Sequence, residues 1–194
     1  MLKRICVFCG SSAGYSQIYR ETAITVGRLL AERQIGVVYG GGQVGLMGAL
    51  ADSALQAGGE IIGVIPKALF EKEIAHAGLR QLCVVDSMHE RKALMAELSD
   101  AFIALPGGFG TMEEFFEVVT WSQLGIHRKP CGLLNMAGFY DSLLALCDHA
   151  DSQGYIRPVD RALIVSETEP AVLIDRICSV EVPVSTKWLS PNQA

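Results

Sequence analysis

The chain has 194 residues, of which 50% are hydrophobic, and a formal net charge of −5 at neutral pH. This length predicts one domain with a core large enough to need no disulfide or metal. The acidic balance gives no broad positive field for nucleic acid, and no apolar run approaches the ~20 residues of a membrane span. Because the opening MLKRICVFCG lacks the long apolar region of a signal peptide, we expect a cytoplasmic protein without membrane or nucleic-acid partners.

Short runs rich in Val and Ile alternate with longer amphipathic segments. The runs favour buried parallel strands because most are apolar at consecutive positions. In chain order, the expected strands are RICVFC (4–9), GVVYG (36–40), EIIGVI (60–65), LCVVD (82–86), AFIAL (101–105), CGLLN (131–135) and ALIVS (162–166). The expected helices span 16–34, 45–57, 87–98, 111–125, 139–152 and 168–178. This alternation predicts a doubly wound, Rossmann-like α/β fold with a mostly parallel sheet of about seven strands.

The domain organisation is expected to be simple. No linker rich in Pro, Gly or Ser divides the chain, so we expect a single domain over residues 1–180 and a loosely docked tail over residues 181–194. Of the six cysteines, Cys6 and Cys9 form the one close pair, and they should point to opposite faces of the first strand. We therefore expect buried free thiols and no zinc site.

The residues that follow the expected strands are the candidate site, because ligands of doubly wound sheets bind beyond the carboxyl ends of the strands. After the second strand, Gly40, Gly42 and Gly45 in GGGQVG match the dinucleotide pattern GxGxxG, with Glu60 about 20 residues on. The match is weak, because it follows the second strand and Glu60 begins the third. A tight strand-to-helix turn with close packing explains the glycines equally, and both interpretations stay open.

The segment SMHERK follows the fourth expected strand. Ser87 and Glu90 fit a capping box, which predicts a helix that begins at Ser87. Arg91 and Lys92 then lie near the positive end of the helix dipole, where cations are disfavoured unless an anion is close by. We favour a functional role for Arg91, whereas Lys92 also fits a solvated surface charge.

The segment PGGFGTMEE follows the fifth expected strand. Gly107, Gly108 and Gly110 precede a helix expected to begin at Thr111, and a glycine loop that leads into a helix N-terminus can hold a phosphate group. The segment is not a Walker A loop, because no GK[ST] follows. Thr111 and Glu114 also fit a capping box, so Glu114 is either a cap or a catalytic carboxylate.

This last segment resembles the PGGxGTxxE signature of the Lonely Guy (LOG) family of cytokinin-activating phosphoribohydrolases, whose members have often been mislabelled lysine decarboxylases. CVFCGSS, VYGGGQVGLMG, MHERK and TWSQLGIHRKPCGLLN also resemble the family. The resemblance implies hydrolysis of the N-glycosidic bond of a purine nucleoside 5′-monophosphate, either an N6-modified adenine (cytokinin) riboside 5′-monophosphate or AMP. The products would be the free base and ribose 5-phosphate. It also implies a homodimer or larger homo-oligomer and no metal or organic cofactor.

The resemblance assigns roles by position. Arg91 and Glu114 correspond to the catalytic pair. The substrate-binding positions are Glu73, Lys92, Gly108, Phe109, Gly110, Thr111, Met112, Glu113 and Thr120. Gly107 joins them as a candidate because it belongs to the same glycine loop. In this scheme Glu114 stabilises the positive sugar and activates water, while Arg91 fixes the substrate or Glu114 and stabilises the departing base.

Two other classes of function remain alternatives. A non-catalytic nucleotide-binding module would use the glycine loops and leave Glu114 as a cap. A decarboxylase would need pyridoxal phosphate on a lysine, and nothing near Lys92 suggests a partner for the pyridinium nitrogen.

Overall fold

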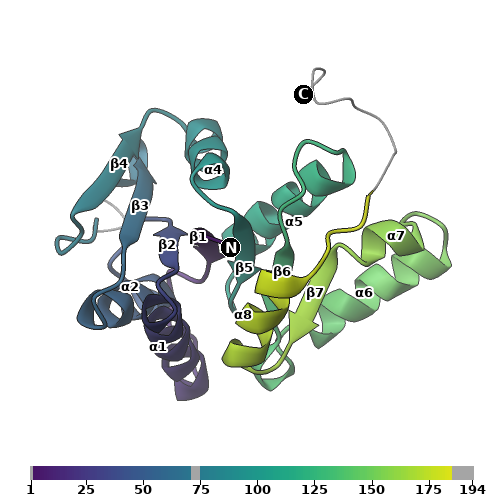
Figure 1. The fold of residues 1–194 in the computed structure, drawn as a ribbon, viewed down its shortest axis with the longest axis horizontal. Helices are drawn as coiled ribbons and strands as arrows, with labels where there is room; N and C mark the ends of the chain where they lie inside the picture. Colours follow the sequence, from purple (N-terminus) through teal and green to yellow (C-terminus); the bar gives the residue numbers. More distant parts are fainter. Residues whose placement is uncertain (1, 71–74, 185–194) are drawn as a thin grey trace.

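The computed structural model describes residues 2–70 and 75–184. Its centre is a seven-stranded sheet in the order β4-β3-β2-β1-β5-β6-β7, in which every neighbouring pair is parallel (Figure 1). The strands are Arg4–Phe8 (β1), Gly36–Tyr39 (β2), Ile61–Pro66 (β3), Gln81–Val85 (β4), Ala101–Ala104 (β5), Cys131–Leu134 (β6) and Ile164–Glu167 (β7). All seven expected strands are confirmed, and so is the doubly wound α/β fold.

The helices between the strands also follow the expected pattern. The six expected helices are Gln17–Glu32 (α1), Gly45–Gln56 (α2), Met88–Glu97 (α4), Phe109–Gln123 (α5), Asp141–Ser152 (α6) and Pro170–Ser179 (α8). Three short helical segments were not expected: Lys67–Phe70 (α3), Met136–Gly138 (η1) and Pro158–Arg161 (α7). Segments of about one turn are too short to show a helical period in the sequence.

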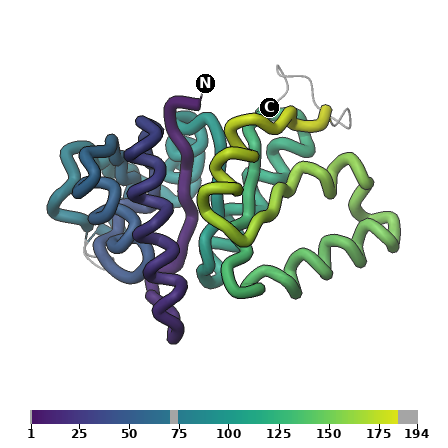
Figure 2. Tube along the Cα trace, turned by 60° about the horizontal axis from the view of Figure 1, so that its bottom comes forward, coloured from purple at the N-terminus to yellow at the C-terminus, as the bar shows by residue number. Residues whose placement is uncertain are grey.

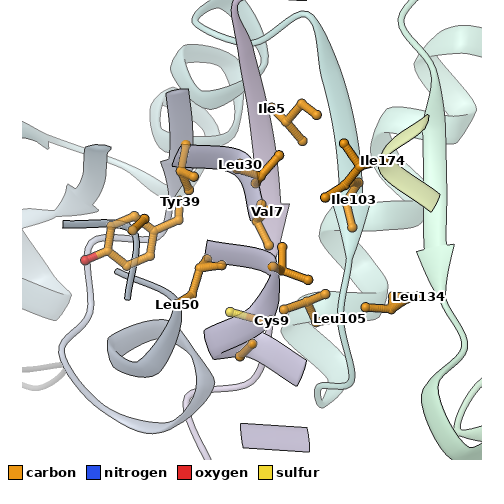
Figure 3. Packing of buried hydrophobic residues seen from close by; sticks show 14 of the residues in the cluster. Ile5, Val7, Cys9, Leu30, Tyr39, Leu50, Ile103, Leu105, Leu134 and Ile174 are labelled. Atoms are coloured by element: carbon orange, nitrogen blue, oxygen red, sulfur yellow. The ribbon is translucent and has the colours of Figure 1, made fainter. Parts of the chain in front are cut away.

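The helices cover the sheet on both faces. α1 and α2 pack together on one face, and α8 lies beside α1 on that face (Figures 1 and 2). α4 and α5 pack on the other face. Each face of the sheet has its own hydrophobic core, and strand β1 contributes to both because its side chains alternate between the faces. Ile5 and Val7 pack with Leu30 and Leu50 on the α1 side, as Figure 3 shows. Phe8 packs in the core on the other face.

The cysteines follow this alternation. Cys9 packs on the α1 side and Cys6 on the opposite face, which confirms that this pair cannot form a disulfide. All six cysteines are free, and four of them are buried. The expectation of burial is wrong for Cys178, which is exposed, and for Cys83, which is half-buried on the edge strand β4.

The carboxyl edge of the sheet has a crevice at its centre. β1 lies between β2 and β5. The chain leaves β1 for α1 on one face and leaves β5 for α5 on the other, so the two loops diverge. The place where two neighbouring strands send their connections to opposite faces is the topological switch point, and doubly wound proteins bind their ligands there. A hydrogen bond of 3.1 Å from the Gly10 amide to the Pro106 carbonyl ties the two loops together at its floor.

Residues 181–184 follow α8 without helix or strand, and the rest of the expected tail lies outside the described residues. None of the helices in the described ranges combines the length and the hydropathy needed to cross a bilayer.

Candidate active site

The first turn of α4 brings Arg91 to the crevice. Ser87 is the N-cap, and its hydroxyl accepts a hydrogen bond of 3.1 Å from the Glu90 amide, which confirms the expected helix start. Glu90 bonds back to the amide of Asp86 at 2.8 Å, one residue earlier than a capping box requires. With the helix fixed in this way, the Arg91 side chain points inward and is only 6% exposed.

The Arg91 guanidinium has few close partners for a buried cation. Its Nη2 lies 3.5 Å from the Gly40 carbonyl oxygen and 3.8 Å from Glu114 Oε1, and its Nη1 lies 3.8 Å from Met88 Sδ. Among the described residues, no group accepts a hydrogen bond from its buried Nε. Buried donors are nearly always satisfied, and guanidinium has five. The spare donors leave Arg91 able to bind an acceptor group of a ligand.

Helix α5 begins at Phe109, two residues before the expected start at Thr111. Gly108 is the N-cap, with an extended backbone (φ −91°, ψ −156°), and no side chain within the described part of the chain caps this end. Thr111 is consequently the third residue of the helix and cannot be its N-cap. The capping-box explanation of Glu114 is therefore wrong, because Glu114 lies in the second turn. The free amides of the first turn can receive an anion.

These groups line one cleft of about 310 Å³. The first turn of α5 and the pair Arg91–Glu114 form one side. The remaining walls are the end of β1 with its loop and an apolar patch, built from Cys9, Gly10, Ser11, Met47, Leu69 and Met88. Burial, and then the charge of Glu114, raise the pKa of the Cys9 thiol far above its usual range, so this cysteine is a neutral wall and not a nucleophile.

The structure brings most of the predicted site residues together. Seven of them line the cleft: Arg91, Gly108, Phe109, Gly110, Thr111, Glu113 and Glu114. Gly107 instead lies beneath Thr111, since a Cβ atom at Gly107 would be 2.1 Å from the threonine hydroxyl. Met112 follows Thr111 on α5, is half-buried and does not line the cleft. Glu73 lies outside the described residues.

Thr120 and Lys92, which are also predicted to bind substrate, do not line the cleft. Thr120 is nine positions beyond Thr111 on α5, about 13 Å along the helix axis. It lines a separate hollow of about 110 Å³, to which α6 and α7 also contribute. The Lys92 ammonium contacts two carboxylates of α5, Glu113 at 2.5 Å and Glu117 at 2.9 Å.

Sequence reasoning missed part of the cleft. The rule that ligands lie beyond strand ends marked the loop after β1 and the segment SMHERK, but not Cys9, Ser11 or Met88 individually. Met47 and Leu69 gave no signal, because an apolar residue on a helix is normally a core residue.

A larger hollow of about 390 Å³ lies at the opposite edge of the sheet, beside Gly59, Glu60 and Arg80. There the Glu60 carboxylate is held by Arg4 through hydrogen bonds of 2.8 and 3.0 Å. That edge holds the amino ends of the strands, where doubly wound proteins do not place their sites. Within the described ranges, no group of His, Cys, Asp and Glu side chains could hold a metal ion.

The fold and the cleft define a Rossmann-like α/β protein with a candidate active site at the topological switch point. The family model described as "Possible lysine decarboxylase" matches residues 47–177. The chain is 52% identical over 175 residues to the cytokinin riboside 5′-monophosphate phosphoribohydrolase LOG7 of Arabidopsis thaliana, covering 90% of this chain and 81% of that one. It is 56% identical over 190 residues to a probable enzyme of the same name, LOGL1, of Oryza sativa subsp. japonica, covering 95% and 85%. The chain belongs to the LOG family.

Solved structures support the fold independently. The molybdenum cofactor binding protein of Rippkaea orientalis superposes with a TM-score of 0.67 at 22% identity, covering 92% of this chain and 99% of that one. The molybdenum cofactor carrier protein of Chlamydomonas reinhardtii gives a TM-score of 0.69 at 19% identity with the same coverage. Likeness at this level of identity concerns the arrangement of helices and strands alone.

Proposed function

We propose that the protein hydrolyses the N-glycosidic bond of a purine nucleoside 5′-monophosphate and releases the free base and ribose 5-phosphate. The substrate is an N6-modified adenine riboside 5′-monophosphate of the cytokinin type, AMP, or both. The names of the relatives at 52% and 56% identity support this reaction. The observation that carries it is the cleft itself, where the uncapped start of α5 lies beside a carboxylate and a buried guanidinium only 3.8 Å apart.

The cleft can serve both ends of such a substrate. The amides of Phe109, Gly110 and Thr111 and the positive end of the α5 dipole receive the 5′-phosphate. One turn further along α5, Glu114 faces the sugar. Cleavage of the bond between C1′ and the base leaves positive charge on the sugar, which the Glu114 carboxylate stabilises. Met47, Leu69 and Met88 offer an apolar surface to the base.

The bond changes assign distinct roles to the two charged residues. The electron pair of the C1′–N bond leaves with the base, which gains a proton, and a water oxygen bonds to C1′. Glu114 accepts the proton of that water. Arg91 acts by electrostatic stabilisation of the departing base and by hydrogen bonding, since a guanidinium is a poor proton donor.

We also propose a cytoplasmic homodimer or larger homo-oligomer. The family resemblance is the basis of this proposal, and the exposed side chains of Leu146 (64%) and Tyr155 (85%) are candidate contacts. Light scattering on the purified protein measures the mass in solution, and a monomer at micromolar concentration would contradict this proposal.

The test of the proposed reaction is the release of free base from AMP, N6-isopentenyl AMP, adenosine and ADP at equal concentrations. Two or three charge-assisted hydrogen bonds to the phosphate should favour the best monophosphate over adenosine by at least about a hundredfold in kcat/KM. ADP should also be poor, because the start of a helix offers a limited number of amides. Equal rates for adenosine and AMP would show that the start of α5 does not bind phosphate.

A variant separates this enzyme from a non-catalytic binding module. Glu114→Gln keeps the size of the side chain and removes its charge, so kcat should fall by at least about a hundredfold while AMP still binds. If the wild-type protein binds AMP without releasing base, the protein is a binding module. If Glu114→Gln retains wild-type turnover, the catalytic role of this carboxylate is wrong.

A further inference from the structure

Lys92 is the neighbour of Arg91 on α4, but its surroundings differ. Its side chain is only 9% exposed, and its ammonium lies 2.5 Å from Glu113 Oε1 and 2.9 Å from Glu117 Oε1. Glu113 and Glu117 are one turn apart on α5 and so share one face of that helix. Lys92 is absent from the lining of the cleft. Its charge is thus already neutralised by α5.

The two helices are therefore joined by two neighbouring ionic contacts. The contact of Lys92 with α5 is short, and its Glu117 half is part-buried while Glu113 is 55% exposed; the contact of Arg91 with Glu114 is 3.8 Å long. Burial by itself would lower the pKa of Lys92, but the hydrogen bonds to Glu113 and Glu117 outweigh it and raise the pKa. The short contact is the stronger constraint, because an ionic hydrogen bond with optimal geometry resists separation more than a long one.

We propose that Lys92 is a positioning residue that holds α4 against α5 and thereby sets the distance between Arg91 and Glu114. This proposal rests on the proposed function for its activity readout. It differs from the substrate-binding role that the family resemblance gives to Lys92. Without the Lys92 charge, the carboxylates of Glu113, Glu114 and Glu117 lie on adjacent turns of α5 with one cation fewer beside them. Their mutual repulsion would move the carboxylate of Glu114 away from its working position.

The first measurement separates positioning from binding. Lys92→Met should lower kcat by about ten- to a hundredfold, as expected for a displacement near 1 Å, and change KM by less than about twofold. In a Glu114→Gln background, where turnover is slow, the Kd for ribose 5-phosphate should also change by less than about twofold. A substrate-binding lysine would instead weaken KM and this Kd by at least about tenfold, and that result would overturn the proposal.

Glu117 provides a second route that does not depend on the folding of Lys92→Met. Glu117 does not line the cleft, yet Glu117→Gln should lower kcat severalfold with the Kd for ribose 5-phosphate unchanged. The double variant Lys92→Met/Glu117→Gln should lose no more kcat than Lys92→Met, because Lys92→Met has already broken the contact with Glu117. Lys92→Arg keeps the charge and should recover much of the activity. Wild-type kcat in Glu117→Gln, or additive losses in the double variant, would contradict the clamp.

Stability measurements test the contact even if no monophosphate is cleaved. Lys92→Met should lower Tm by about 2–5 °C, because it leaves the part-buried Glu117 carboxylate without its partner. The double variant should melt well above the value expected from additive losses. The matched control is Arg28→Met on α1, which breaks a 2.8 Å pair with Glu32 whose side chains are 50% and 51% exposed. It should leave kcat and Tm unchanged. Additive Tm losses would overturn the clamp, whereas an inactive wild-type protein would overturn only the proposed function.

Discussion

The two glycine-rich loops at the carboxyl edge, residues 40–45 and 106–110, look alike in sequence but differ in the space around them. In the first, Gly45 has φ +64° and a Cβ atom there would lie 2.3 Å from the backbone of Ser11. In the second, a Cβ atom at Gly108 or Gly110 would meet nothing within 4 Å. The first loop uses glycine so that two backbones can touch. The second leaves open room at a helix N-terminus, which is what an anionic ligand requires.

This difference bears on the pattern GxGxxG. Gly45, its last glycine, is required by the close contact with the loop after β1, and Gly48 in the helix that follows is similarly crowded by the Gln43 carbonyl at 2.0 Å. The structure therefore supports the close-packing interpretation of GGGQVG over a dinucleotide site. One glycine in each loop lies against a residue that lines or supports the cleft. Gly107 of the second loop packs on Thr111, and Gly40 of the first loop packs on Arg91.

The largest effect is expected at Gly45. Gly45→Ala combines a left-handed backbone with a backbone clash, so the free energy of unfolding should fall by about 3–4 kcal/mol. Gly58→Ala is the matched control, because Gly58 has φ +77° but open space around its Cβ position, and it should cost only about 1–2 kcal/mol. Urea denaturation measures both. Equal losses would show that backbone strain alone explains Gly45, and the comparison of the two loops would lose its basis in packing.

The next effect is expected at Gly40, where a Cβ atom would lie 2.1 Å from Arg91 Nη2. The end of an arginine side chain can move, so Gly40→Ala should cost little stability but displace the guanidinium. We expect kcat/KM to fall about a hundredfold, similar to Arg91→Lys, which keeps the charge but loses the planar fork. Steady-state release of base measures kcat/KM, and a melting curve measures the stability. Full activity in Gly40→Ala would mean that the position of Arg91 is not critical.

The smallest effect is expected in the second loop. Gly108→Ala and Gly110→Ala should leave the free energy of unfolding within about 0.5 kcal/mol of wild type, since neither methyl group meets an atom of the protein. Each should nevertheless lower kcat/KM for AMP by at least about tenfold, because the methyl group occupies room proposed for the phosphate. Activity on adenosine, if measurable, should change less. A loss of stability without a selective loss for AMP would make this loop a structural turn like the first.

Much of the molecule could be predicted because its causes are local in sequence. Each strand is a short apolar run, and Ser87 caps α4 three residues before the amide it satisfies. The glycine loop was expected before a helix, although the start of α5 was placed two residues late. That error arose because Thr111 and Glu114 match a capping box, whereas a glycine at Gly108 starts the helix without any side-chain cap.

The sequence by itself determined the succession of strands and helices along the chain, the edge of the sheet that carries the site, and the candidate charged residues Arg91 and Glu114. Only the tertiary structure decided which groups the charged side chains contact. Lys92 meets Glu113 and Glu117, and Arg91 meets Gly40, 51 residues away in the chain. Secondary structure follows from periodicity and caps that act within a few residues. Pairing between elements depends on how whole helices pack against the sheet, and no short stretch of residues contains that information.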